Sequence, residues 1–273
     1  MPEGPEIHRA ADKIARAIAH QPVEEVYFAF EHLQSYENLF SGQTIISVEP
    51  RGKVLLTQFE DGLSIYSHNQ LYGKWMVCKA RHYPETKRQL RLAIHNSRKS
   101  ALLYSASDIE VLSPEEVEVH PFLSRLGPDV VNPQTSLETV TAQVTAAKFR
   151  RRKLAGLLLN QHYLSGLGNY LRSEILFVAR IHPAKRPMDC SESALEALAE
   201  AAIAIARQSY KTGGITNDPA LAAQLKTEGV KRSQYRFWVF NRVDQPCHLC
   251  STPILKETLA GRRLYYCPTC QAA

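Results

Sequence analysis

The first residues of the chain carry a potential nucleophile. They read Met1-Pro2-Glu3-Gly4-Pro5-Glu6. Removal of an initiator methionine is usual before a small residue, and here it would leave Pro2 with a secondary α-amine. Such a group titrates near about pH 8, so part of it is neutral at pH 7. Its attack on an aldehyde-like carbon would give an iminium cation, a strong electron sink, with Glu3 beside it as a candidate proton donor. The alternative is that Pro2 only precedes a helix.

Four of the six cysteines form a metal-binding pattern. Cys247 and Cys250 make one C-x-x-C pair, and Cys267 and Cys270 make a second pair after sixteen intervening residues. Four thiolates at this spacing suit a tetrahedral zinc ion and leave no coordination position for water. We therefore expect one Zn²⁺ with a structural role, folding a segment too small to be stable alone.

Two segments carry residues suited to binding phosphate. In Arg51-Gly52-Lys53, the glycine permits close approach of the backbone, and Lys53 is placed to hold a phosphate or to aid proton transfer. A solvated lysine at a strand end is the more common explanation. In Ser165-Gly166-Leu167-Gly168-Asn169-Tyr170-Leu171-Arg172, glycines lead into a predicted helix whose backbone N–H groups and dipole favour an anion. We expect Asn169 to cap that helix and to contact a phosphate, whereas a plain helix–turn–helix corner is the alternative.

Two further segments have side chains suited to DNA. Gln70, Leu71 and Tyr72 follow a predicted strand within His68–Gly73, and side chains of this kind are used as wedges that unstack a duplex. Packing of Leu71 and Tyr72 in a core is the competing interpretation. Between the two cysteine pairs, residues 254–258 and 264–266 favour a β-hairpin with Gly261 at its turn. Arg262 and Arg263 would lie beside that turn, where arginines contact phosphates.

The elements that must position these residues follow from periodicity. Residues 3–19 have apolar side chains at helical spacing and predict an amphipathic helix. The next hundred residues instead alternate in short β-branched or aromatic runs separated by turns, which indicates a β-sandwich or barrel. The predicted strands are 23–28, 44–48, 53–59, 63–67, 74–77, 89–95, 101–104 and 109–112.

Beyond a Gly- and Pro-containing segment the pattern is helical. We expect helices at 135–147, 153–161, 169–179 and 192–210, and a loop over 211–234. The predicted fold class is therefore α+β. The predicted domains are a β-sandwich over 1–127, a linker over 128–134, a helical DNA-binding domain over 135–236 and a zinc finger over 237–273.

The charge of the chain favours a polyanionic partner. The formal net charge is +6, but residues 146–273 hold 19 Lys or Arg against 9 Asp or Glu, whereas residues 1–145 hold 14 against 18. This asymmetry, with the basic segment 148–153, points to nucleic acid. No apolar run reaches the roughly 18 residues of a membrane span and no secretion signal opens the chain, so we expect a soluble, intracellular protein. Cys78 is expected to be an inert core thiol, and Cys190 has no assigned role.

Taken together, these segments resemble those of the endonuclease VIII branch of the formamidopyrimidine-DNA glycosylase superfamily. The members of this branch are bacterial DNA glycosylase/lyases. The resemblance runs from Met1 to Gln271 and is most specific at 1–6, 51–53, 66–73, 103–110, 155–172 and the zinc segment. It implies an N-terminal β-sandwich, a helix–two-turn–helix domain and a zinc finger. It also implies excision of oxidised pyrimidines from duplex DNA followed by β,δ-elimination, in a monomeric protein of the bacterial cytoplasm, associated with the nucleoid.

The resemblance also implies roles for individual residues. Pro2 would attack the sugar C1′, Glu3 would protonate the sugar ring oxygen and then shuttle protons, and Glu6 would support the site. Lys53 would bind phosphate and assist catalysis. The DNA contacts would come from Asn169 and Arg262 on flanking phosphates and from Gln70, Leu71 and Tyr72, which would fill the gap left by the flipped base.

Three alternatives remain open from the sequence. A sister enzyme that prefers oxidised purines shares Pro2, Glu3, Lys53 and the zinc finger, although Gly4 and the Gln70–Tyr72 segment favour the endonuclease VIII branch. A non-catalytic zinc-finger DNA-binding protein and a metal-dependent nuclease are the others. Residues 213–234 do not map onto the family pattern, so the lesion range and the preference for the opposite base stay undetermined.

Overall fold

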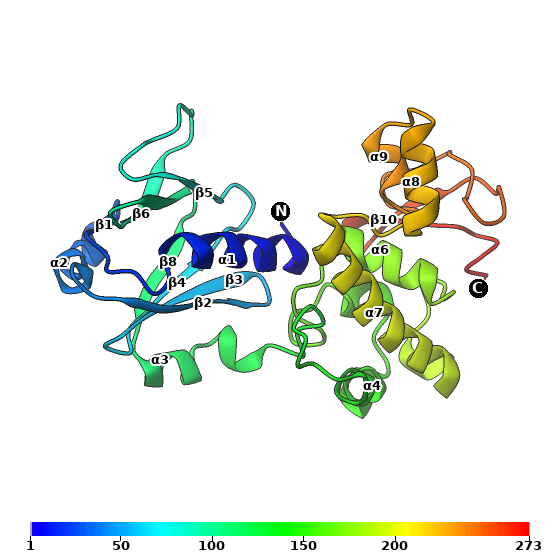
Figure 1. Cartoon of the computed structure of the whole chain (residues 1–273). Helices are drawn as coiled ribbons and strands as arrows, with labels where there is room; N and C mark the ends of the chain where they lie inside the picture. The colour runs from blue at the N-terminus through cyan, green and yellow to red at the C-terminus, as the bar shows by residue number, and fades with distance from the viewer. Residues whose placement is uncertain (1, 273) are drawn as a thin grey trace. The chain divides into compact units, whose positions relative to one another are not determined.

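The computed structural model describes residues 2–272, which fall into two compact units. The first unit contains Pro2 and residues 6–125, and the second contains residues 3–5 and 126–272. The first is built mainly of strands and the second mainly of helices, with one small hairpin near its end (Figure 1). The predicted α+β class is confirmed.

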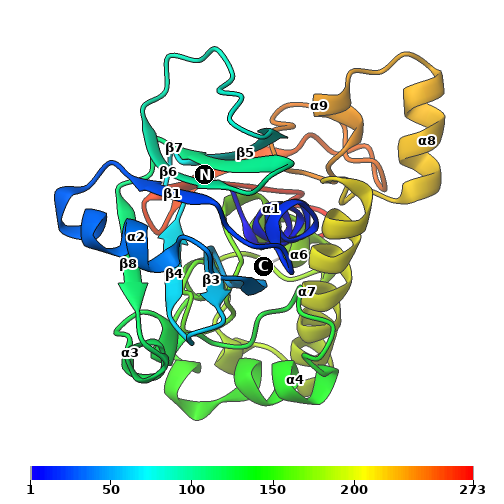
Figure 2. The ribbon, with the colours of Figure 1, turned by 60° about the vertical axis from the view of Figure 1, so that its left-hand side comes forward.

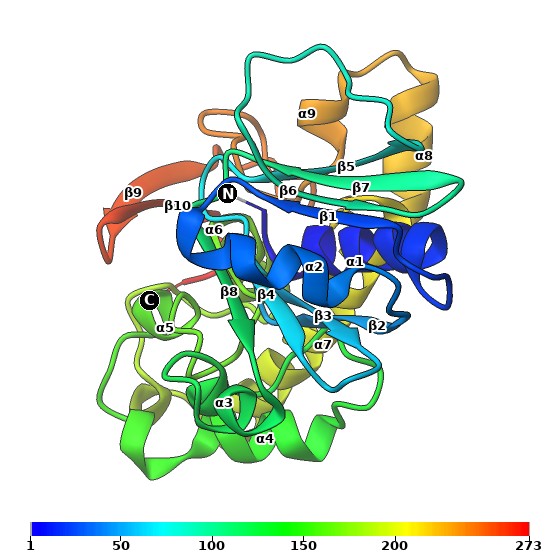
Figure 3. The same ribbon diagram turned by 90° about the vertical axis from the view of Figure 1, so that its left-hand side faces the viewer.

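The first unit is a β-sandwich of two four-stranded antiparallel sheets. One sheet has the order β1-β6-β7-β5 and the other β2-β3-β4-β8, and Figure 3 shows them as two layers. All eight predicted strands are present. Their bounds are β1 Glu25–Phe28, β2 Ile45–Arg51, β3 Val54–Phe59, β4 Ser64–His68, β5 Lys74–Lys79, β6 Leu90–His95, β7 Lys99–Tyr104 and β8 Asp108–Leu112.

Helix α1, Gly4–Ile18, belongs to the core of this sandwich. Its apolar side chains recur every three or four residues and are at most 1% exposed; they are Ile7, Ala11, Ile14 and Ile18. They pack with residues of both sheets in one hydrophobic cluster. Burying each isoleucine contributes roughly 1.5–3 kcal/mol. The amphipathic helix predicted over 3–19 is thus confirmed.

Several short helices of the first unit were not predicted. They are η1 Glu31–Tyr36, α2 Glu37–Phe40, α3 Pro114–Val119 and η2 Leu123–Arg125. The signal for α3 was present, because Ser113 and Glu116 form a capping box and Pro114 occupies the first helical turn. Helix α3 and η2 place apolar side chains over an outer cluster around Leu56 and Tyr66.

The second unit contains the helices α4 Leu137–Thr145, η3 Ala147–Phe149, α5 Leu154–Leu157, α6 Asn169–Val178, η4 Pro187–Asp189 and α7 Glu192–Thr212. Helix α7 packs against α4 and α6 (Figure 2). Three of the four predicted helices are confirmed, but the one predicted over 153–161 is wrong beyond its first turn. There the Asn160 side chain accepts from the His162 N–H, and Gln161 donates to the carbonyls of Leu159 and Leu167, so the polar side chains form a turn instead.

The loop predicted over 211–234 is also wrong, because it contains α8, Pro219–Thr227, and α9, Arg232–Tyr235. The Asp218 carboxylate accepts from the Leu221 N–H at 2.8 Å, and Pro219 occupies the first helical position. An Asp-Pro pair is therefore a helix start here and not a loop signal.

The hairpin between the cysteine pairs is confirmed. Strand β9, Leu255–Leu259, pairs antiparallel with β10, Arg262–Tyr266. Gly261 in the turn has a φ of +71°, a conformation that favours glycine. A small cluster of Phe177, Val239, Ile254 and Tyr265 buries one side of this module against α6.

Helix α6 is buried along most of its length and carries two charged residues into the interior, Arg172 and Glu174. Burial raises the pKa of the Glu174 carboxyl, while its hydrogen-bond donors oppose this shift. Those donors are the backbone N–H groups of Trp238, Val239 and Phe240, at 2.8–2.9 Å, and the Thr216 hydroxyl. One carboxylate thus fixes the segment that leads into the zinc module.

Among the helices formed by residues 2–272, none is long and apolar enough to cross a membrane.

Candidate active site and zinc centre

The carboxylate of Glu3 lies at the amino end of α6. Its Oε1 accepts from the Tyr170 N–H at 2.9 Å and its Oε2 from the Leu171 N–H at 3.2 Å. The first N–H groups of a helix have no partner within the helix, and the helix dipole is positive there. Glu3 is only 4% exposed, so these contacts stabilise a carboxylate that is otherwise costly to bury.

Glycines make this contact sterically feasible. A Cβ atom on Gly168 would lie 2.4 Å from Cδ and 2.5 Å from Oε1 of Glu3. The N–H of Gly4 donates to the Gly166 carbonyl at 2.7 Å, and a Cβ on Gly4 would lie 3.0 Å from the Gly166 Cα. The glycines of the 165–172 segment therefore leave room for Glu3 and Gly4 to lie against its backbone.

The prediction that Asn169 caps α6 is wrong. The N-cap is Gly168, which makes no side-chain cap, and Asn169 is the first helical residue. The Glu3 carboxylate, and not the phosphate expected from the sequence, accepts from two of the N–H groups at this terminus. The Asn169 side chain instead accepts from Nη2 of Arg172 at 2.7 Å.

Arg172 links the predicted phosphate contacts, and the sequence analysis gave it no role. Its guanidinium is fully buried and also donates to the backbone carbonyls of Ala155, Leu259, Arg262 and Arg263, at 2.9–3.3 Å. Burial, with the nearby charge of Arg262, lowers its pKa to about 10, which leaves it a cation at neutral pH. Asn169, through its side chain, and the exposed Arg262, through its backbone carbonyl, thus both contact the Arg172 guanidinium.

Lys53 lies in the two-residue turn between β2 and β3. Gly52 precedes it with a φ of +62°, and Arg51 pairs with Val54 across the turn. Lys53 is only 5% exposed, so the interpretation as a solvated lysine is wrong. Because Val54 pairs with His68, this turn lies at the same end of the sheet as the Gln70–Tyr72 segment.

The predicted wedge, Gln70-Leu71-Tyr72, lies in the connection from β4 to β5, residues 69–73. Leu71 is 58% exposed and Tyr72 68% exposed, which excludes the core-packing interpretation. The Gly73 N–H closes the turn on the Asn69 carbonyl at 2.7 Å, and a Cβ on Gly73 would lie 2.4 Å from that oxygen. Exposed apolar side chains on a tightly closed turn have the form of an intercalating wedge.

The remaining predicted residues lie near the amino terminus. Pro2 is half-buried and directly precedes Glu3. Glu6, in the first turn of α1, accepts from Nη2 of Arg9 at 2.8 Å, and both side chains are 30% exposed. This pair neighbours the Pro2–Glu3 segment in sequence.

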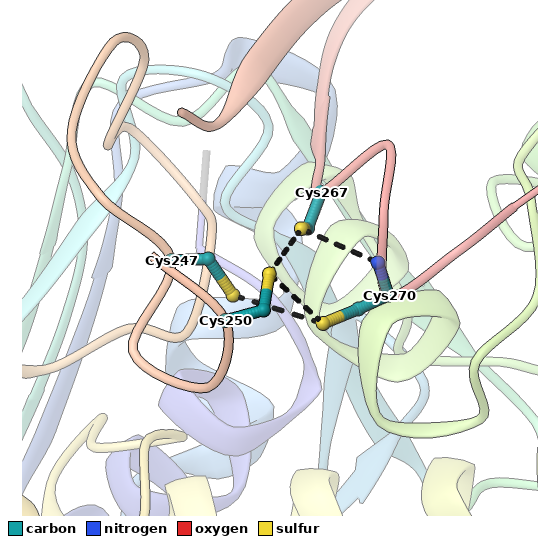
Figure 4. Close-up of side chains that lie close together, drawn as sticks. All are labelled: Cys247, Cys250, Cys267 and Cys270. Carbon is teal, nitrogen blue, oxygen red and sulfur yellow. Dashed lines mark hydrogen bonds between the residues drawn. The ribbon is translucent and has the colours of Figure 1, made fainter. Parts of the chain in front are cut away.

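The four predicted zinc ligands converge (Figure 4). The sulfur atoms of Cys247, Cys250, Cys267 and Cys270 all lie within 4.8 Å of one another, with closest pairs at 3.4–3.9 Å. Zn–S bonds of about 2.3 Å in a tetrahedron separate the sulfurs by roughly 3.8 Å, so the geometry fits zinc. The N–H groups of Leu249 and Cys270 point at two of the sulfurs, as hydrogen bonds that stabilise thiolates do.

Three family models together match most of the chain. The formamidopyrimidine-DNA glycosylase N-terminal domain matches residues 1–106, the formamidopyrimidine-DNA glycosylase H2TH domain matches 126–219, and the zinc finger found in FPG and IleRS matches 244–273. Proteins named Endonuclease 8 from Klebsiella pneumoniae and Escherichia coli are 47% and 46% identical over 271 residues, which is 99% of this chain and 100% of each relative. The chain belongs to the endonuclease 8 family.

Solved structures agree with the endonuclease 8 assignment at the level of fold. A Lactococcus lactis Fpg in complex with abasic-site DNA superposes with a TM-score of 0.81 at 22% identity, covering 99% of this chain and 100% of that one. The same enzyme with DNA containing an oxidised pyrimidine gives 0.81 at 23% identity, with full coverage of both chains. With the zinc-finger match, the sulfur geometry assigns one structural zinc to this endonuclease 8 chain.

Gly168→Ala should release Glu3 from the α6 terminus, because the added methyl group would overlap its carboxylate. Losing hydrogen bonds to a buried charge should lower the free energy of unfolding by about 1.5–3 kcal/mol, measured by chemical denaturation. Gly156→Ala is the control, since its Cβ would meet only Ala260 Cβ at 3.7 Å. It should be neutral or slightly stabilising. Equal losses in both variants would contradict the account of Gly168.

Cys250→Ser should abolish stoichiometric zinc binding and lower the Tm by roughly 5 °C or more, because the metal holds the 247–270 module together. Elemental analysis and thermal unfolding measure the two effects. Cys190→Ser is the matched control, because Cys190 lies outside the sulfur cluster, packs against the edge of the core and donates its thiol to the Arg186 carbonyl. Zinc retained at one ion per chain in Cys250→Ser would refute the ligand assignment.

Proposed function

We propose that this protein is a bifunctional DNA glycosylase and abasic-site lyase of base-excision repair, in which the amine of Pro2, exposed by removal of Met1, is the nucleophile. The observation that carries the proposal is the buried Glu3 carboxylate, held by two N–H groups of α6 one peptide bond from Pro2. A fixed acid–base group directly adjacent to an amine is what iminium chemistry requires.

The reaction can be written with every proton accounted for. The Glu3 carboxylate accepts a proton from the Pro2 ammonium. The neutral amine attacks C1′ as the damaged base departs with the electron pair of the glycosidic bond, and the proton left on the Pro2 nitrogen passes to the departed base. Protonated Glu3 then gives its proton to the sugar ring oxygen. The ring opens to an iminium between Pro2 and C1′.

The iminium then drives strand cleavage. Its positive charge acidifies the C2′ hydrogen, and transfer of that proton to the Glu3 carboxylate expels the 3′ phosphate by β-elimination. A further elimination expels the 5′ phosphate and leaves a one-nucleotide gap with phosphate at both ends. None of these steps uses the zinc ion, whose role here is to fold the hairpin.

The other predicted residues have supporting roles in this proposal. Lys53 binds a phosphate near the lesion and assists catalysis, and Glu6 supports the amino-terminal segment. Asn169 and Arg262 bind the phosphates that flank the flipped nucleotide, and the contacts of both to Arg172 support a joint function. Gln70, Leu71 and Tyr72 fill the space vacated by the flipped base.

The partner is duplex DNA that contains oxidised bases or abasic sites. The exposed cations at 148 and 150–153 and the basic character of residues 146–273 support this. Identity of 46–47% to proteins named Endonuclease 8, against 22–23% to Fpg structures, favours oxidised pyrimidines over oxidised purines. We further propose a monomer that acts in the bacterial cytoplasm at the nucleoid, with the domains bounded at 1–127, 135–236 and 237–273.

Borohydride trapping on abasic-site DNA tests the nucleophile. Reduction should fix a covalent adduct, and peptide mapping should place it at Pro2, because borohydride reduces the iminium. Pro2→Gly changes the secondary amine to a primary one and should reduce adduct formation at least about tenfold. A variant that retains methionine or carries an amino-terminal tag should bind DNA but form no adduct. An adduct at any lysine, or none from the processed chain, would overturn the mechanism.

Competition between two duplexes tests the lesion class. One carries dihydrouracil and the other an oxidised guanine, in the same sequence context. We expect the dihydrouracil duplex to be cleaved faster by about tenfold or more under single-turnover conditions. Faster cleavage of the oxidised guanine duplex would refute the pyrimidine assignment and leave the lyase mechanism intact.

A further inference from the structure

Three connections of the β-sandwich meet at the end of the sheets from which the wedge projects. They are residues 69–73 between β4 and β5, the last residues of the 80–89 connection, which lead into β6, and residues 105–107 between β7 and β8. The strand register explains this convergence, because Lys74 and Leu90 both pair with Tyr104, and His68 pairs with Asp108. The exposed wedge is therefore flanked by two other segments of the same unit.

The first flanking segment holds the backbone of the wedge. Nη1 of Arg88 donates to the Tyr72 carbonyl at 2.5 Å. Arg88 is exposed and forms no ion pair among the residues that the structure describes, and its guanidinium binds this carbonyl. A guanidinium bound to a backbone oxygen fixes the position of Tyr72 without restricting what its side chain contacts.

The second flanking segment holds the side chain of Gln70. The Ser107 hydroxyl donates to Oε1 of Gln70 at 2.7 Å. Gln70 has a φ of +48°, a left-handed conformation that is unfavourable for a residue with a side chain and needs support from its surroundings. The wedge is thus held at its first residue by Ser107 and at its last by Arg88.

The two flanking segments are themselves joined. The N–H of Ser105 donates to the Gln89 carbonyl at 2.7 Å. The segment that carries Arg88 is also attached to the sheet, because the Tyr83 hydroxyl contacts Nε2 of the buried His95 at 2.9 Å. The Ser100 hydroxyl contacts Nδ1 of His95 at 2.6 Å and accepts from the Arg81 N–H at 2.8 Å. These contacts hold the first residues of the 80–89 connection at the opposite end of the sheet, and the Ser105–Gln89 hydrogen bond holds the residue next to Arg88.

We propose that Arg88 and Ser107 are positioning residues that hold the wedge in its base-displacing conformation before DNA binds. A wedge that was mobile in free protein would lose conformational freedom on insertion, and this cost would oppose unstacking. The two residues act through Gln70–Tyr72 and touch no reacting atom. The inference rests on the proposed function, since it assigns them to opening a damaged duplex.

Arg88→Ala is the central variant, and single-turnover excision of dihydrouracil from a duplex is the central measurement. We expect a rate about tenfold lower, the size of effect typical of one lost hydrogen bond to a charged group. 2-Aminopurine beside the lesion should show slower unstacking by a similar factor. Cleavage of an abasic site in single-stranded DNA needs no wedge and should not change. Ser107→Ala should give a smaller loss in the same direction, and Arg88→Lys should recover part of the rate.

Two comparisons separate positioning from other roles. Lys87→Ala removes a neighbouring exposed cation with the same change in net charge and should leave the excision rate unchanged. In a background with Gln70, Leu71 and Tyr72 all changed to alanine, Arg88→Ala should have no further effect, because nothing remains for it to position.

The remaining outcomes overturn the proposal. If Arg88→Ala slows excision equally in the wedge-free background, or lowers the salt dependence of binding to undamaged duplex, Arg88 contacts DNA directly. If Arg88→Ala lowers both the Tm and the cleavage of single-stranded abasic DNA, the role of Arg88 is only in stability. If the unaltered protein gives no borohydride adduct on single-stranded abasic DNA, the proposed function fails. If that adduct forms and Arg88→Ala excises normally, only this inference fails.

Discussion

The contact between the Glu3 carboxylate and the amino end of α6 constrains much of the second unit. A carboxylate that is 4% exposed is costly to bury unless hydrogen bonds replace its water, and the N–H groups of Tyr170 and Leu171 donate two such bonds. This contact requires Gly168 at the helix N-cap. The position of Glu3 therefore depends on the residue that begins a helix more than 160 residues later in the chain.

Helix α6 also carries two buried charged side chains that bind backbone groups of other segments. Arg172 offers only donors, and it meets carbonyl oxygens from the α5 segment and the zinc hairpin. Glu174 offers only acceptors, and it meets N–H groups of residues 238–240. Most hydrogen bonds of these two buried charges are made with backbone groups of the connecting segments, although Nε of Arg172 is buried without a partner among residues 2–272. Helix α6 thus holds both the hairpin of the zinc module and the segment 238–240 that precedes it.

The sequence predicted features that depend on local periodicity or fixed spacing. The eight strands, the helix through Ile7 and Ile14, and the four cysteines belong to this class. Prediction from the sequence failed where the same residues are common both in loops and at helix starts. Asp218-Pro219 is such a pair, and here it begins α8. Prediction also failed where the partner is remote: Asn169 could not be recognised as a partner of Arg172 rather than a cap, and Arg172 could not be placed, because its carbonyl partners lie up to 91 residues away.

Arginine-to-carbonyl contacts hold several connections of the chain in place. Arg172 binds the hairpin carbonyls, Arg88 binds that of Tyr72, and Arg207 of α7 binds the carbonyls of Val130, Asn132 and Thr135. A guanidinium has five donors in a rigid fork and does not lose its charge at neutral pH, so it can satisfy several carbonyls at once. Because these bonds use only the backbone of the connection, the side chains of Leu71, Tyr72 and Arg262 remain exposed. The backbone of such a connection can therefore be fixed while its side chains stay available for a substrate.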